Sequence, residues 1–145
     1  MYKYLFIDFH THSDRQSSDL INLQTLHVTP ELQAESLPNS CSLGLHPWFV
    51  QLETWEMAWV NLVDLAKLSQ VVAIGECGLD RNIDLPLEIQ IAIFKRHIEL
   101  AEELQKPLVI HCVRAFAELI ALKKNTKSSM PWIIHGFNNS CYAEA

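Results

Sequence analysis

Histidines and a glutamate in this 145-residue chain stand directly after short apolar segments, where side chains of different strands could meet. His10 and His12 form an H-x-H pair, and residues two apart in an extended segment point the same way, so both can bind one ion. Glu76 follows the apolar run 71–74. Imidazole and carboxylate ligands together suit zinc, manganese, iron or nickel better than calcium. The candidate residues in such positions are His10, His12, His46, Glu76, His111 and His135.

The number of candidate ligands predicts more than one closed metal site. A carboxylate such as Glu76 can bridge two ions, and two ions about 3.5–4 Å apart activate a water molecule and neutralise a developing oxyanion. Metal binding can lower the pKa of water to about 7, which supplies hydroxide at neutral pH. This chemistry is hydrolysis, and phosphodiesters are a natural target for it.

Apolar runs and helical patterns alternate along the chain and predict the elements that position these residues. Six short runs are continuously apolar, which suits parallel strands buried on both faces. Apolar residues spaced by three and four predict helices over 52–66, 86–106 and 115–122, and no helix is expected over 13–40. The predicted strands cover residues 4–7, 26–29, 42–45, 71–74, 107–110 and 131–134.

This alternation of strands and helices predicts an α/β fold in which residues 1–145 form one domain. Ligands of such folds bind at the carboxyl ends of the strands, so we expect the candidate residues to converge at that end of the sheet. His27 and His97 lack this placement and are expected to be structural. Cys77 and Cys112 directly follow candidate ligands, so we expect them to point away from the metal as small apolar fillers.

Composition excludes several classes of protein. The chain is 49% hydrophobic with a net charge of −6, which excludes wholesale disorder. No apolar run approaches the roughly 18 residues of a membrane span, and the N-terminus reaches Asp8 too early for a signal peptide. Four cysteines without a C-x-x-C pair predict reduced thiols and a cytoplasmic protein. An acidic chain needs a local positive charge to bind a polyanion, and a metal would supply it.

Five segments of the sequence resemble the TatD family of metal-dependent deoxyribonucleases, which are amidohydrolase-like TIM barrels. They occur in the family's order from the first predicted strand to the end of the chain. The H-x-H pair alone is a weak signal, but together with the I-G-E-x-G-L-D run it is strong. The segments are D-F-H-T-H at 8–12, G-L-H-P-W at 44–48, I-G-E-C-G-L-D at 74–80, P-L-V-I-H at 107–111 and I-H-G-F at 134–137.

The resemblance implies a site with two divalent metal ions, which could be zinc, manganese, magnesium, iron or nickel. In it, His10 and His12 would hold one ion, and His111 and His135 would hold the other. Glu76 would bridge the two ions and take part in catalysis. The implied reaction is cleavage of a phosphodiester bond in DNA, with a small phosphoester as the other candidate substrate.

Further roles follow from the same resemblance. His46, the second catalytic candidate, would lie near the substrate phosphate, and Asp8 would orient a ligand histidine from behind. Asp80 would be structural or would orient a ligand in the same way. Arg81 and Arg114 are candidate phosphate contacts. Both depart from the family's pattern, since Arg114 stands three residues after the fifth-strand histidine rather than two, and Arg81 stands where an aromatic residue is common.

The family also supplies a final metal-binding Asp after a later strand, and the chain has no such residue before Ala145. A complete eightfold barrel needs about 250 residues. We therefore expect residues 1–145 to form the N-terminal portion of a longer barrel, with about six strand-helix units. If these residues were the whole molecule, the open edges of such a sheet would favour self-association.

Two alternative functions remain open from the sequence. Phosphoesterases of the polymerase-and-histidinol-phosphatase type also open with D-x-H-x-H, although the 74–80 run argues against them. The other alternative is a truncated chain that binds metal but has no activity, because the last ligand is missing.

Overall fold

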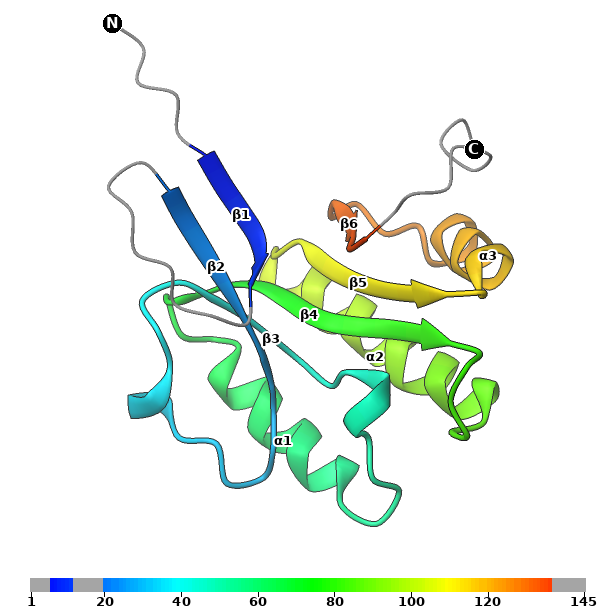
Figure 1. Cartoon of the computed structure of the whole chain (residues 1–145), viewed down its shortest axis with the longest axis horizontal. Coiled ribbons are helices and arrows are strands. Elements are labelled where there is room, and N and C mark those ends of the chain that lie inside the picture. Colours follow the sequence, from blue (N-terminus) through cyan, green and yellow to red (C-terminus); the bar gives the residue numbers. More distant parts are fainter. Residues whose placement is uncertain (1–5, 12–19, 137–145) are drawn as a thin grey trace, which may run out of the picture.

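The computed structural model describes residues 6–11 and 20–136, with side chains from residue 23 onward. One sheet of six parallel strands follows the chain order, and α1 and α2 lie along one of its faces (Figure 1). The strands are β1 (Phe6–Thr11), β2 (Leu20–His27), β3 (Cys41–Gly44), β4 (Val71–Asp80), β5 (Leu108–Val113) and β6 (Trp132–Ile134). The helices are α1 (Trp55–Leu65), α2 (Leu87–Leu104) and α3 (Phe116–Thr126), with 3₁₀ turns η1 (Ala34–Ser36) and η2 (Pro47–Phe49).

The predicted α/β architecture is confirmed, but the second strand was placed wrongly. It was expected over 26–29 and is instead Leu20–His27. The polar residues of this strand make it hard to recognise from the sequence, because some of them are buried and paired. Thr25 is buried, and its hydroxyl group lies 3.0 Å from that of Ser42 in the neighbouring strand β3.

The core lies mainly between the sheet and the helices. Fully buried residues such as Leu43, Leu62, Ile74 and Phe94 form one cluster on the helix-covered side. Three cysteines are free thiols buried in this cluster, and two of them confirm the prediction of small apolar fillers. They are Cys41, Cys77 and Cys112. A second, smaller cluster of buried residues consists of Leu23, Ala73 and Val109.

Strand β4 changes its alternation in the middle. Ile74 and Cys77 both belong to the helix-side cluster, although residues three apart in a regular strand point to opposite faces. The pairing of β4 with β5 shifts at the same place, between Gly75 and Cys77. Because of this shift, Glu76 points to the face away from the helices, where Ala73 also lies.

Glycine is required at two positions where β4 passes close to the backbone of β5. Gly75 has a φ of +127°, and a Cβ atom there would lie 2.1 Å from the carbonyl oxygen of Val109. Gly78 has a φ of +140°, and its Cβ would lie 2.1 Å from the carbonyl oxygen of His111. No L side chain fits either position without moving the backbone of β5.

Substituting Gly75→Ala should lower the free energy of unfolding by about 3 kcal/mol, because it adds both a steric clash and an unfavourable φ. Urea denaturation followed by far-UV circular dichroism would measure this. Val72→Ala, at a residue that is 43% exposed in the same strand, is the matched control and should cost less than about 1 kcal/mol. Equal losses in the two variants would contradict the assigned role of Gly75.

Candidate active site

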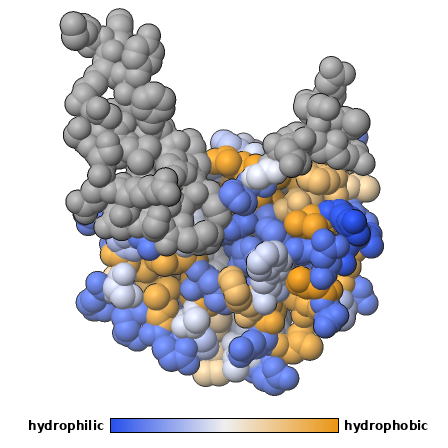
Figure 2. Space-filling view, in the orientation of Figure 1, coloured by the Kyte–Doolittle hydropathy of each residue, from blue (hydrophilic) through white to orange (hydrophobic). Residues whose placement is uncertain are grey.

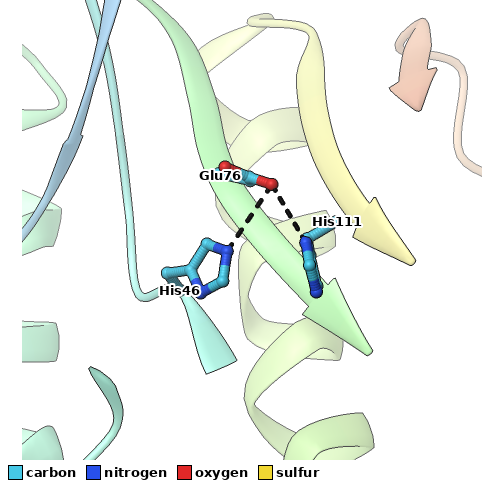
Figure 3. A group of neighbouring side chains, drawn as sticks. All are labelled: His46, Glu76 and His111. Atoms are coloured by element: carbon cyan, nitrogen blue, oxygen red, sulfur yellow. Dashed lines mark ion pairs between the residues drawn. The ribbon is translucent and has the colours of Figure 1, made fainter. Parts of the chain in front are cut away.

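Three side chains from neighbouring parts of the sheet converge near the carboxyl end of its strands (Figure 3). His46 follows β3 and is the N-cap of η2, Glu76 lies within β4, and His111 lies within β5. One ligand atom from each of the three lies within 4.8 Å of the others, so together they could hold a metal ion. Glu76 and His111 were expected just after their strands, but β4 continues to Asp80 and β5 to Val113.

Glu76 is the centre of this group. Its carboxylate is 3% exposed, and Oε1 lies 3.2 Å from Nδ1 of His111 and 3.5 Å from Nε2 of His46. A buried carboxylate needs such partners, because an ionised group removed from water without compensation is costly. The position of Glu76 depends on the shift in β4, which turns the residue away from the helix side.

Asp80 holds the opposite side of the His111 ring. Its Oδ2 atom lies 2.8 Å from Nε2 of His111 and accepts a hydrogen bond of 2.7 Å from the indole N–H of Trp48. Its Oδ1 atom accepts from the backbone N–H of Asn82 at 2.8 Å. Burial alone would raise the pKa of Asp80, but the hydrogen bonds from His111, Trp48 and Asn82 outweigh it and lower that pKa below its usual value. Asp80 therefore stays ionised.

The same contacts raise the pKa of His111. Burial alone would lower it, but the hydrogen bonds and charges of Glu76 and Asp80 outweigh burial. Without a metal, both ring nitrogens of His111 can donate to carboxylates. A metal bound at Nδ1 would displace that proton, and Asp80 would keep accepting from Nε2. This is the arrangement in which a carboxylate fixes the tautomer of a ligand histidine.

His46 differs from His111 in its available nitrogen. Its Nδ1 atom accepts a hydrogen bond of 3.1 Å from the backbone N–H of Trp48. A neutral imidazole has one N–H, so the proton must be on Nε2, which faces Glu76. In this tautomer Nε2 is a donor and not a metal ligand. The geometry therefore favours His46 as a hydrogen-bond donor at the site, and its expected place near a phosphate stays a prediction.

Two further histidines hold the segment that carries His46. His97 is fully buried in α2, and its Nε2 atom accepts from the backbone N–H of Leu45 at 3.0 Å. His27, at the end of β2, accepts from the backbone N–H of His46 at 3.1 Å through Nδ1. Burial lowers the pKa of each to about 4, so both rings stay neutral and can accept. Both act structurally as expected, but the contact between His27 and the site was not predicted.

The structure does not describe the side chains of all the other predicted site residues. His12 lies outside the described residues, and of His10 and Asp8 only the backbone in β1 is described. His135 is exposed and is not part of the group above, although its backbone N–H donates to Ile110 at 2.8 Å.

The two arginines proposed as phosphate contacts are both exposed. Arg81 forms an ion pair with Glu118 at the start of α3. Arg114 follows β5 in the left-handed conformation, with a φ of 51°. Their role at a phosphate stays a prediction.

The family relationship is decided by comparison with known proteins. The family model described as TatD related DNase matches residues 20–144. The chain belongs to this family. The 3'-5' ssDNA/RNA exonuclease TatD of Rahnella sp. (strain Y9602) is 35% identical over 122 residues, which cover 78% of this chain and 44% of that protein. The protein of the same name from Klebsiella pneumoniae (strain 342) is 40% identical over 101 residues, or 67% of this chain and 37% of that protein.

A solved structure agrees with the fold. The crystal structure of YjjV, a TatD homologue from Escherichia coli K12, matches with a TM-score of 0.69 at 25% identity, covering 96% of this chain and 62% of YjjV. The six-stranded parallel sheet is thus consistent with a partial TIM-type barrel, as the TatD resemblance implied. The chain spans less than half the length of the curated TatD relatives described above. No helix among the described residues is long and apolar enough to cross a membrane.

The two site histidines should respond differently to substitution. His111→Asn should lower the affinity for Mn²⁺ or Zn²⁺ at least ten-fold, because it removes a nitrogen ligand. His46→Asn should change that affinity less than about three-fold, because the Nε2 atom of His46 carries a proton. Isothermal titration calorimetry would measure both variants. A loss in His46→Asn as large as that in His111→Asn would assign His46 as a ligand instead.

Metal affinity should also depend on pH in a defined direction. The pKa of His111 is raised above its usual 6.5, so protons should begin to compete with the metal at a pH above that value. Affinity should be constant at higher pH and fall as the pH decreases through the raised pKa. Asp80→Asn should move this fall to lower pH, because it removes one of the groups that raise the pKa of His111. An affinity that stays flat from about pH 8 to about pH 5 would argue against histidine ligation.

Proposed function

We propose that this protein is a metal-dependent phosphodiesterase that cleaves single-stranded nucleic acid. The observation that carries the proposal is the chain of contacts from Glu76 through His111 to Asp80, at the carboxyl ends of parallel strands. A second support is the TatD family, whose matched relatives are named 3'-5' ssDNA/RNA exonucleases. The substrate is inferred from those names.

The donor set of the site fits a divalent metal. Nδ1 of His111 and the carboxylate of Glu76 would hold it, and Asp80 would fix the histidine tautomer. His10, His12 and His135 are proposed from the sequence as the remaining ligands of a two-ion site. The bound metal would supply an acidified water molecule and positive charge next to the phosphate.

The residues of the chain itself would orient and stabilise the substrate. The Nε2–H group of His46 would donate to a phosphate oxygen, since its other nitrogen accepts from the backbone N–H of Trp48. Such a donor stabilises the charge that develops on the phosphate in the transition state. The net charge of −6 makes this local arrangement necessary, because the chain as a whole repels a polyanion.

The test is a cleavage assay with a labelled single-stranded oligonucleotide. Cleavage should require added Mn²⁺, Mg²⁺ or Zn²⁺, and a chelator should abolish it. The Glu76→Gln substitution should lower the cleavage rate by a factor of at least about 100. Glu56→Gln, at an exposed carboxylate on α1, is the matched control and should keep full activity.

Two other outcomes separate the alternatives. Hydrolysis of a phosphomonoester without cleavage of the oligonucleotide would replace the proposal with a phosphatase of the polymerase-and-histidinol-phosphatase type. Metal binding by calorimetry without hydrolysis of either substrate would identify an inactive metal-binding chain. Both measurements should be made on the full-length protein, since the chain spans only part of its relatives.

A further inference from the structure

We propose that Trp48 and Phe49 form a stacking platform for unpaired nucleobases next to the phosphodiester site. The proposal rests on the proposed function, because it assigns a subsite for the same single-stranded substrate. The platform would hold the bases of the nucleotides adjoining the bound phosphate. It would therefore favour unpaired strands over duplexes, whose bases are already stacked and paired.

Both rings are more exposed than large aromatic residues usually are. Trp48 is 59% exposed and Phe49 is 56% exposed, and they are neighbours on the turn η2. Figure 2 shows hydrophobic residues scattered among polar ones on this face of the molecule. The remaining large exposed apolar residues among those described are Leu52, Met57, Val60 and Val72. None of these four is aromatic. Adjacent exposed rings beside a site of proposed catalysis indicate a binding surface.

Trp48 is held in one orientation. Its indole N–H donates to Asp80 at 2.7 Å. Its ring stands edge-on to the imidazole of His46, with centroids 5.4 Å apart, and to that of His111, with centroids 5.6 Å apart, at 77° in both cases. A ring fixed in this way loses little further entropy on binding, which favours its use as a platform.

Phe49 extends the surface away from the metal site. Its ring lies 5.3 Å from His46 and 5.3 Å from His27, measured between centroids. It also lines a cavity of about 580 Å³ together with His27, Leu45 and Trp55, among others. The cavity lies beside Phe49 and gives room for a planar group next to that ring.

A nucleobase is the partner that fits these observations. Every base has a π-face, so stacking on aromatic rings holds a strand without reading its sequence. The base of a nucleotide is joined to its phosphate by a single sugar, and both rings contact His46, the proposed phosphate donor. A base stacked on these rings would therefore lie next to the phosphate that the site is proposed to bind.

The test measures binding without cleavage. The full-length protein carrying Glu76→Gln would be titrated into a labelled single-stranded oligonucleotide, and into one whose last three nucleotides at the 3' end are abasic. Fluorescence anisotropy should show that adding Trp48→Ala weakens binding of the intact strand about ten-fold and binding of the abasic strand less than about two-fold. Phe49→Ala should act in the same direction.

Two controls make the result specific to the ring. Trp48→Phe keeps an aromatic ring but loses the hydrogen bond to Asp80, and it should retain most of the affinity for the intact strand. Val60→Ala, at a residue that is 64% exposed on α1, should leave binding of both strands unchanged. Thermal denaturation would establish that each variant is folded.

The proposal is overturned if Trp48→Ala weakens both strands equally, if Trp48→Phe is as weak as Trp48→Ala, or if Trp48→Ala binds the intact strand normally. Normal binding would mean that the rings are covered by another part of the protein. Cleavage is not part of this measurement, so failure of the proposed nuclease activity and failure of the platform give different results.

Discussion

The shift in alternation within β4 is the constraint on which the site depends. A regular strand would put Glu76 on the same side as Ile74, in the apolar layer under the helices. Instead, the register with β5 slips between Gly75 and Cys77, and Glu76 turns toward His111 on the other face. The slip requires β4 to approach β5 closely, and glycine makes this approach sterically feasible. The conformation of one strand thus determines where the buried charge lies.

That buried charge explains the arrangement around it. Glu76 and Asp80 are both almost fully buried, and both contact His111, one at each ring nitrogen. Two carboxylates sharing one imidazole leave negative charge that a single proton only partly offsets. A cation at this place would offset the remaining charge, which agrees with a group of side chains that could hold a metal ion. The indole of Trp48 satisfies a further lone pair of Asp80 and joins the surface of the protein to the site.

The fold was largely predictable because its signals are local. Continuous apolar runs marked the strands beginning at Cys41, Val71 and Leu108, and helical spacing marked α2. Most of β2 was missed because its polar residues do not look like a buried strand; the hydroxyl group of Thr25 pairs with that of Ser42, 17 residues away, and no local pattern reveals such a contact. For the site, the expectation that ligands bind near the carboxyl ends of parallel strands identified His46, Glu76 and His111. It could not show which nitrogen of each ring is free, because that depends on backbone groups positioned by the tertiary structure.

The histidines show why residue type alone does not define a ligand. His97 donates from Nδ1 to the carbonyl of Ile93 and accepts at Nε2 from Leu45, so its neutral form uses both nitrogens. Protonation would replace the acceptor with a second donor and leave the Leu45 N–H facing it, which agrees with a pKa lowered to about 4. His27 supports His46 in the same way. Neutral histidines that accept from backbone N–H groups therefore hold residues 45 and 46, and they allow His46 to present a defined N–H at the site. The rings of His27 and His97 are thus as necessary to the geometry of the site as the ring of His111, which would bind the metal.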